Sequence, residues 1–156
     1  MGVNIRSAEI SDAKGISELI SPLAKKYVCP TCDASVHDIL LNSMSEENVE
    51  KYLSTNYTYV VAVTANGEMV GVAGVRDNSH LYHLFVDDNF QGNGLSRQLW
   101  EAVKEEAIKN GNSGIFTVNS AVNAENVYLR FGFKRTEGIR NRQGMIDIPM
   151  LLEFDY

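Results

Sequence analysis

Residues 84–96 read Leu-Phe-Val-Asp-Asp-Asn-Phe-Gln-Gly-Asn-Gly-Leu-Ser and decide the fold. The segment opens with an apolar run typical of a buried strand and closes where an amphipathic helix begins. Between the two, Gly92 and Gly94 allow the backbone to turn tightly and to expose its N–H groups. Such groups, added to the positive end of a helix dipole, bind phosphate or pyrophosphate. The alternative is a glycine-rich turn that only caps the helix.

Two other nucleotide-binding motifs do not fit this loop. A dinucleotide fingerprint needs a third glycine where Arg97 stands, and it normally lies in the first βα turn of a parallel fold. A P-loop needs Gly-Lys followed by Ser or Thr, which the loop lacks.

The pattern on both sides of the loop predicts a mixed α/β sandwich. Asn66-Gly67 is a strong hairpin signal between two β-branched runs, so three strands form an antiparallel meander ahead of the loop. We expect strands at residues 3–6, 57–63, 69–75, 80–86, 115–118, 133–139 and 145–154. We expect helices from residue 12, over 35–53 with a break near Ser43, over 94–109 and over 123–131. No repeat or linker interrupts the chain, which predicts one domain over residues 1–156.

Two segments carry a resemblance to a known family. After the strand that ends at Val86, Gln91-Gly92-Asn93-Gly94-Leu95-Ser96 resembles the acetyl-CoA signature of the GNAT N-acetyltransferase superfamily, with Ser96 at a position usually held by Gly or Ala. In residues 119–133, Ala124, Tyr128, Gly132 and Phe133 fall at the spacings of a second GNAT pattern. The usual Asn three positions before Ala124 is replaced by Ala121, with Asn119 and Asn123 flanking it. Residues 27–55 resemble the family least.

The resemblance implies a GNAT fold: a mixed, mostly antiparallel sheet of six to seven strands, with a splayed central strand pair and about four helices. It implies an acyltransferase that uses acetyl-CoA as co-substrate and acetylates a primary amine by direct attack in a ternary complex. The alternative is a non-catalytic acetyl-CoA sensor or regulatory module. The cofactor-binding residues that it implies are Leu84, Phe85, Val86, Gln91, Gly92, Asn93, Gly94, Leu95, Ser96, Asn119 and Asn123.

The resemblance also suggests the catalytic groups. Tyr128 occupies the position whose hydroxyl usually lies near the sulfur of CoA, and a phenol can donate a proton there. His80, with an ordinary pKa near ~6.5, is the candidate base. Strict alternation places His80 on one face with Tyr82, Leu84 and Val86. The plain alternatives are a Tyr128 that only packs against the sheet and a solvent-exposed His80.

Charged residues beside the loop leave two interpretations open. Arg97 lies in the first turn of the predicted helix, an unfavourable place for a cation unless an anion binds nearby, so it is a candidate for the phosphates of CoA. Arg130 is a weaker candidate. For both, the alternative is a solvated surface charge.

Composition limits the partners. The net charge is −6, the pI is about 5.0, and the sequence has no basic stripe. These features argue against nucleic acid as a partner and slightly favour small cationic amines as substrates. No apolar run predicts a membrane span or signal peptide, so we expect a cytoplasmic protein with a small-molecule or peptide amine acceptor. The last apolar run, Met150-Leu151-Leu152, could serve a homodimer contact.

The two cysteines form a Cys29-Pro30-Thr31-Cys32 motif. A structural zinc needs four ligands and only His37 lies nearby, while a thioredoxin-like site would follow a strand. We expect no metal. A loop without redox or metal function is the favoured interpretation, and a metal or redox protein is the rival one.

Overall fold

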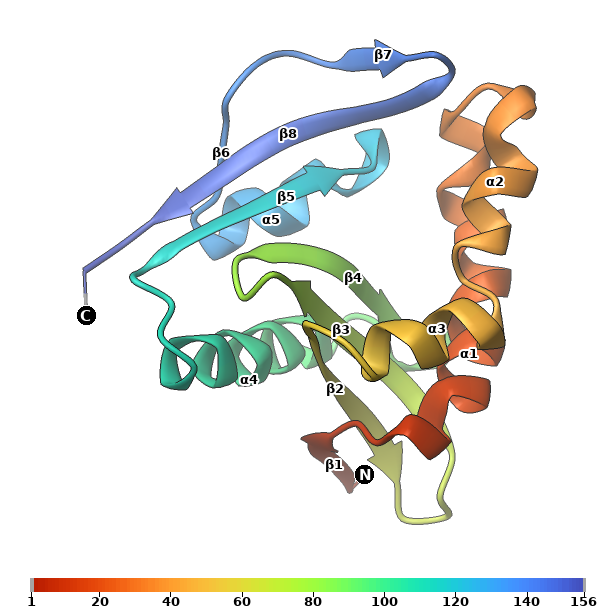
Figure 1. The fold of residues 1–156 in the computed structure, drawn as a ribbon, viewed down its shortest axis with the longest axis vertical. Helices are drawn as coiled ribbons and strands as arrows, with labels where there is room; N and C mark the ends of the chain where they lie inside the picture. Colours follow the sequence, from red (N-terminus) through yellow and green to blue (C-terminus); the bar gives the residue numbers. More distant parts are fainter. Residues whose placement is uncertain (1, 156) are drawn as a thin grey trace.

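The computed structural model describes residues 2–155 and folds them around one eight-stranded sheet (Figure 1). The strands are β1 (Val3–Ser7), β2 (Tyr57–Thr64), β3 (Met69–Arg76), β4 (His80–Val86), β5 (Ile115–Ser120), β6 (Lys134–Arg135), β7 (Arg140–Arg142) and β8 (Met145–Glu153). The α-helices are α1 (Ala13–Tyr27), α2 (His37–Asn42), α3 (Glu46–Leu53), α4 (Leu95–Lys109) and α5 (Glu125–Phe131). The strand order is β1-β2-β3-β4-β5-β8-β6, with β7 paired to β8.

This arrangement confirms the expected mixed α/β fold. Every neighbouring strand pair is antiparallel except β4 and β5, which run parallel. The described residues form eight strands and five α-helices, slightly more than the resemblance implied. The extra strand arises because the predicted strand over residues 133–139 pairs with β8 only at Lys134–Arg135, and β7 then forms separately.

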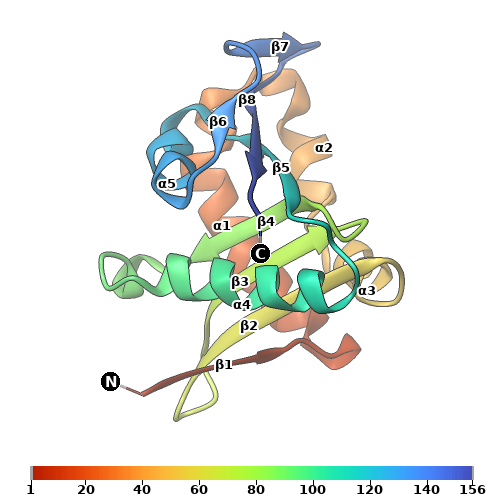
Figure 2. The ribbon, with the colours of Figure 1, turned by 90° about the vertical axis from the view of Figure 1, so that its left-hand side faces the viewer.

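Two apolar cores lie on opposite faces of the sheet (Figure 2). Helix α4 covers one face and packs against β2, β3 and β4, with Leu99 and Val103 buried on that side. Helices α1 and α3 cover the other face, where Ile16 and Val49 are fully buried. Because both faces of the meander are covered, β2 and β3 consist of nearly continuous apolar residues.

Strands β4 and β5 separate soon after they meet. Their ladder contains only two residue pairs, His80 with Thr117 and Leu81 with Val118. Beyond Leu81 the two strands diverge toward the side on which α1 and α2 stand (Figure 1). This confirms the splayed central pair, and it leaves one edge of β4 without a neighbouring strand.

A β-bulge in β4 corrects the expected side-chain alternation. Gly74 pairs with His83 and Val75 with Leu81, so Tyr82 is the additional residue. Tyr82 and His83 therefore both face the side of α1 and α3, together with His80. The prediction that His80 and Tyr82 share a face with Leu84 and Val86 was wrong, because a single inserted residue reverses the alternation.

Strand β8 lies between β5 and β6, inside the sheet. Met150 and Leu152 are buried in the core of the chain itself, so they offer no surface to a second copy. The homodimer stays a prediction. None of the helices within residues 2–155 has the length and apolarity needed to cross a membrane.

Gly74 allows the ring of Tyr59 to lie directly across β3. A Cβ atom at residue 74 would overlap this ring, which is buried and held by a 2.8 Å hydrogen bond between its hydroxyl and Nδ1 of His83. We expect Gly74→Ala to lower the free energy of unfolding by about 1–3 kcal/mol, measured by urea denaturation. Gly138→Ala is the control, because nothing lies within 4 Å of its added Cβ. Equal effects of the two substitutions would contradict this packing.

Candidate functional site

A pocket of about 970 Å³ occupies the space between the diverging strands β4 and β5. Its walls come from β4, the loop before α4, the segment after β5, α5, α2 and the start of β8. This volume suits a small-molecule or cofactor site. Of the fourteen residues that the sequence suggested, twelve line it: His80, Leu84, Phe85, Val86, Gln91, Gly92, Gly94, Leu95, Ser96, Asn119, Asn123 and Tyr128.

The glycine loop has the backbone geometry of an anion site. Gly92 and Gly94 have φ angles of 81° and 79°, which glycine adopts without strain. Gly94 is the N-cap of α4, and no side chain caps this helix. The N–H of Gln98 bonds to the Gly94 carbonyl at 3.1 Å, so the amides of residues 95–97 precede the first intrahelical bond. Free amides and the helix dipole together favour a phosphate here.

Gln91 fixes the loop to the end of β4. Its side-chain amide donates to the Val86 carbonyl at 3.0 Å and to Oδ1 of Asp88 at 3.3 Å. Beyond these contacts, the edge of β4 from Tyr82 to Val86 faces β5 without a ladder partner. Its backbone groups are therefore available to a ligand that runs along the strand.

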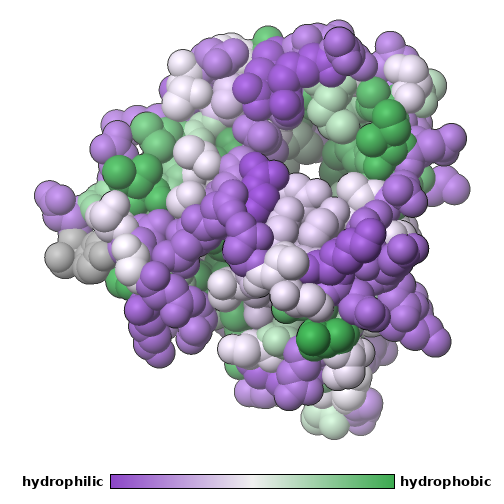
Figure 3. Space-filling model, viewed as in Figure 1, coloured by the Kyte–Doolittle hydropathy of each residue, from purple (hydrophilic) through white to green (hydrophobic). Residues whose placement is uncertain are grey.

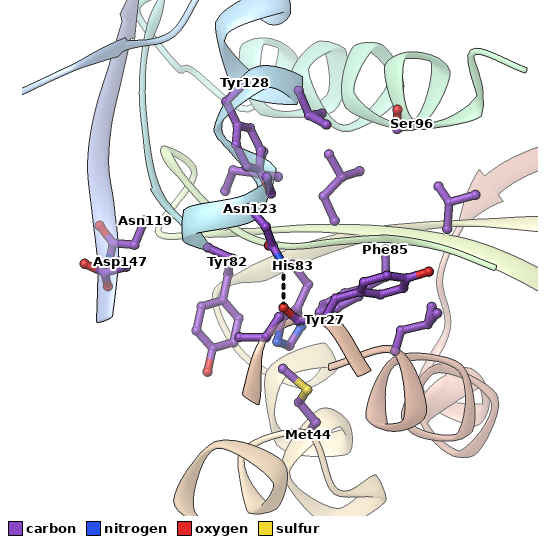
Figure 4. A pocket seen from close by; sticks show the side chains of 18 of the residues that line it. Tyr27, Met44, Tyr82, His83, Phe85, Ser96, Asn119, Asn123, Tyr128 and Asp147 are labelled. Atoms are coloured by element: carbon purple, nitrogen blue, oxygen red, sulfur yellow. Dashed lines mark hydrogen bonds between the residues drawn. The ribbon is translucent and has the colours of Figure 1, made fainter. Parts of the chain in front are cut away.

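Tyr128 reaches from α5 into the pocket (Figure 4). Its ring is buried and packs edge-to-face against Phe131 and Phe133. Within residues 2–155, no group hydrogen-bonds to the Tyr128 hydroxyl. Burial raises the pKa of Tyr128 to about 12, so the phenol carries its proton at neutral pH.

Two histidines of β4 line the same pocket. His80 lies with Nδ1 2.7 Å from Oγ1 of Thr117, and burial, with the nearby charge of Arg76, lowers the pKa of His80 to about 4. His83 is buried against the Tyr59 hydroxyl, and burial lowers the pKa of His83 to about 3. Both imidazoles are therefore neutral at pH 7, and each has a lone pair that can accept a proton.

The two asparagines already have partners. The side-chain amide of Asn123 donates to the Tyr27 carbonyl at 2.9 Å, the bond drawn in Figure 4. The Tyr27 hydroxyl donates to Oδ1 of Asp88 at 2.6 Å, so Tyr27 connects the two walls of the pocket. Oδ1 of Asn119 accepts from Arg140 at 3.0 Å. The sequence did not indicate Tyr27, because it starts the segment that resembles the family least.

Two suggested residues do not line the pocket. Asn93 is exposed at the tip of the glycine loop. Arg97 turns away, donates to the Arg130 carbonyl at 2.9 Å and lies 5.1 Å from the centre of the Phe131 ring. The Arg130 carbonyl at the end of α5 thus stabilises the Arg97 guanidinium, a cation that is unfavourable in the first turn of α4. Arg130, by contrast, lines the pocket.

The end of the pocket away from the glycine loop was not predicted. There, α2, the end of β3 and strands β7 and β8 contribute polar and apolar side chains. The lining residues in this part include Ile39, Met44, Arg76, Tyr82, Arg142 and Asp147. No local motif marks them, because they come from separate elements that meet only in the folded chain.

Cys29 and Cys32 are both buried and form no disulfide. Burial raises the pKa of the Cys29 thiol. The Cys32 sulfur accepts from the backbone N–H of Ile146 at 3.5 Å, and thereby joins the segment before α2 to β8. Across residues 2–155, no three His, Cys, Asp or Glu side chains come together in a way that could hold a metal ion.

Comparison with solved structures finds the same architecture repeatedly. The PaiA N-acetyltransferase of Thermoplasma acidophilum, in complex with coenzyme A, is 15% identical with a TM-score of 0.80, over 99% of this chain and all of that one. YncA of Salmonella typhimurium, with its cofactor acetyl-CoA, is 22% identical with a TM-score of 0.68, over 100% and 96%. An aminoglycoside 6′-N-acetyltransferase complexed with coenzyme A is 14% identical with a TM-score of 0.70, over 96% and 94%.

Sequence comparison with curated proteins finds no match. A family model described as "Acetyltransferase (GNAT) domain" matches residues 29–154, which include the pocket walls from β4 to β8. The chain therefore belongs to the GNAT acetyltransferase family.

Proposed function

We propose that this protein transfers an acetyl group from acetyl-CoA to a primary amine, by direct attack within a ternary complex. The observation that carries the proposal is the pocket that runs from an uncapped helix N-terminus, along an open strand edge, to the hydroxyl of the buried Tyr128. The CoA or acetyl-CoA bound to the structural neighbours supports the same assignment.

The residues of the loop and of β4 fit the two parts of CoA. The amides of residues 95–97, with Gly92 and Gly94, would hold the pyrophosphate. Along Leu84, Phe85 and Val86, the backbone groups that point away from β3 would hydrogen-bond the pantetheine as a substitute strand, and would help polarise the thioester carbonyl. Asn119 and Asn123 would contribute only if they exchange their present partners.

Amide formation from a thioester requires a neutral amine, a stabilised oxyanion and a proton for the departing thiolate. Tyr128 would donate that proton, because its buried phenol is protonated at neutral pH and faces the pocket. His80 would accept a proton from the amine nitrogen after attack, when that nitrogen is more acidic. With a pKa of about 4, His80 is too weak a base to deprotonate a free alkylammonium efficiently.

The acceptor is proposed to be a small molecule or peptide amine. The presence of an aminoglycoside 6′-N-acetyltransferase among the structural neighbours supports a small-molecule acceptor. A cytoplasmic location stays a prediction from the sequence.

Substitution of Gly94 should weaken cofactor binding specifically. Alanine at a positive φ costs about 1–2 kcal/mol, so Gly94→Ala should distort the loop and raise the Kd for acetyl-CoA about tenfold in calorimetry. Gly111→Ala is the matched control, because Gly111 also has a positive φ with nothing near its added Cβ, at the far end of α4. An unchanged Kd for Gly94→Ala, or an equal rise in the control, would remove the loop from the binding site.

Removal of one hydroxyl tests the proton donor. Tyr128→Phe keeps the ring packing and should lower kcat about 100-fold, a typical loss for a general acid, with little change in the Kd for acetyl-CoA. CoA-thiol release measures kcat, and Tyr27→Phe tests a second hydroxyl in the pocket wall. If Tyr128→Phe retains full kcat, Tyr128 has no role in the chemistry. If the wild-type protein binds acetyl-CoA without thiol release for any amine, the transferase proposal fails.

The pH profile should follow the amine and not a histidine. His80 and His83, with pKa values of about 4 and 3, stay neutral from pH 6 to 8 and contribute no inflection there. An alkylamine with a pKa near ~10.4 gains neutral form about tenfold per pH unit, so kcat/KM should rise about 100-fold between pH 6 and pH 8. A plateau beginning near pH 6.5 would show a histidine with its ordinary pKa and contradict the burial of these rings.

A further inference from the structure

The pocket has two ends that differ in charge and origin. The glycine loop follows Val86, whereas Arg76 pairs with His80 at the opposite end of β4, about 20 Å away along the strand. We call this second region the acceptor end and define it by Ile39, Met44, Arg76, Tyr82, Arg142 and Asp147. If acetyl-CoA enters from the glycine loop, as the proposed function requires, the amine must come from the acceptor end.

The acceptor end has no carboxylate available to a cationic substrate. Among the described residues, Asp147 is the only acidic side chain that lines the pocket. Its Oδ1 accepts from Nε of Arg140 at 2.6 Å and its Oδ2 from Arg142 at 2.7 Å. The carboxylate is buried, with 9% of the side chain exposed, and both of its oxygens are engaged. It therefore fixes the arginines of β7 and leaves an excess of positive charge.

Two arginines in this region stay accessible. The Arg142 side chain is 53% exposed and bonds to Asp147 through one guanidinium nitrogen, so its other N–H groups are open. The Arg76 side chain is 41% exposed, lies 5.5 Å from the centre of the Tyr82 ring, and is only loosely paired with Asp77 at 3.8 Å. The charge of Arg76 helps to lower the pKa of His80, so its field reaches the site proposed for chemistry.

We propose that the acceptor is an amine that also carries a carboxylate, an amino-acid-like substrate, with Arg142 as the main carboxylate anchor and Arg76 assisting. Guanidinium groups bind carboxylates through paired, charge-assisted hydrogen bonds. The apolar side chains of Ile39 and Met44 would cover the body of the substrate. Figure 3 shows a hollow on this face, between hydrophilic side chains near β7 and hydrophobic ones near α2. A diamine or polyamine would instead meet two arginines and no free acid.

The charge inside the pocket differs from the charge of the whole chain. The net charge of −6 leaned toward small cationic amines, but the acidic residues behind that charge lie outside the pocket, apart from the neutralised Asp147. Local charge governs which substrate binds, whereas net charge acts mainly on solubility and encounter.

Matched acceptors test the proposal. We would compare L-lysine, L-methionine and L-phenylalanine with their carboxamides, and with spermidine, by CoA-thiol release from the full chain. The free acid of at least one pair should exceed its amide in kcat/KM by about 10- to 100-fold, the effect of hydrogen bonds to a charged group. In Arg142→Gln this preference, measured as the acid-to-amide ratio of kcat/KM, should fall about tenfold. Arg142→Lys should retain part of the preference, because it keeps the charge.

A control and a binding measurement separate the outcomes. Lys109→Gln makes the same change in net charge at the far end of α4 and should leave the acid preference intact. A preference for spermidine or for the amides would overturn the proposed acceptor class. So would an acid preference that survives in Arg142→Gln. Either result would leave the transferase proposal intact. Calorimetric binding of acetyl-CoA with no thiol release for any acceptor would overturn the transferase, and the acceptor inference with it.

Discussion

The loss of pairing between β4 and β5 after Leu81 is the constraint on which the site depends. Two residue pairs are enough to place the strands in one sheet, and their divergence then leaves backbone groups of β4 without a partner. Unpaired backbone is unfavourable away from water, so such an edge is suited to a ligand that supplies the missing hydrogen bonds. The same divergence creates the 970 Å³ pocket, which extends from the glycine loop to Arg142 and Asp147.

The opening is held from both sides by packed elements. Helix α4 and the core around Trp100 fix β4 from one face, and α1 fixes it from the other. Tyr27, the last residue of α1, then connects the segment after β4 with the segment after β5 through Asp88 and Asn123. The two hydrogen bonds of Tyr27 join both sides of the pocket wall. The end of α1 therefore sets the width of the cleft between β4 and β5.

Local patterns predicted the parts of the site that local geometry determines. Gly92 and Gly94 were identifiable because a tight turn ahead of a helix requires positive φ. Tyr128 was identifiable only through the resemblance of its segment, with Gly132, to the family pattern. The bulge at Tyr82 depends on strand register and escaped the alternation argument. The Arg140–Asp147–Arg142 group was missed, because these charged side chains come together only in the folded chain, where β7 lies beside the pocket. Contacts over long sequence separation are invisible to periodicity.

Burial is the main cause of the protonation states of the central groups, and at His80 the charge of Arg76 adds to it. Removal from water disfavours the ionised form of both kinds of side chain, so the phenol of Tyr128 keeps its proton while the imidazoles of His80 and His83 lose theirs. A proton donor and two proton acceptors therefore coexist in one cleft at neutral pH. Positive charge lies at the two ends of this cleft: partial charge on the backbone amides of the glycine loop, and full charge on the guanidinium groups near β7. In this acidic protein, neutral titratable side chains thus lie between the backbone amides at one end of the pocket and the guanidinium groups at the other.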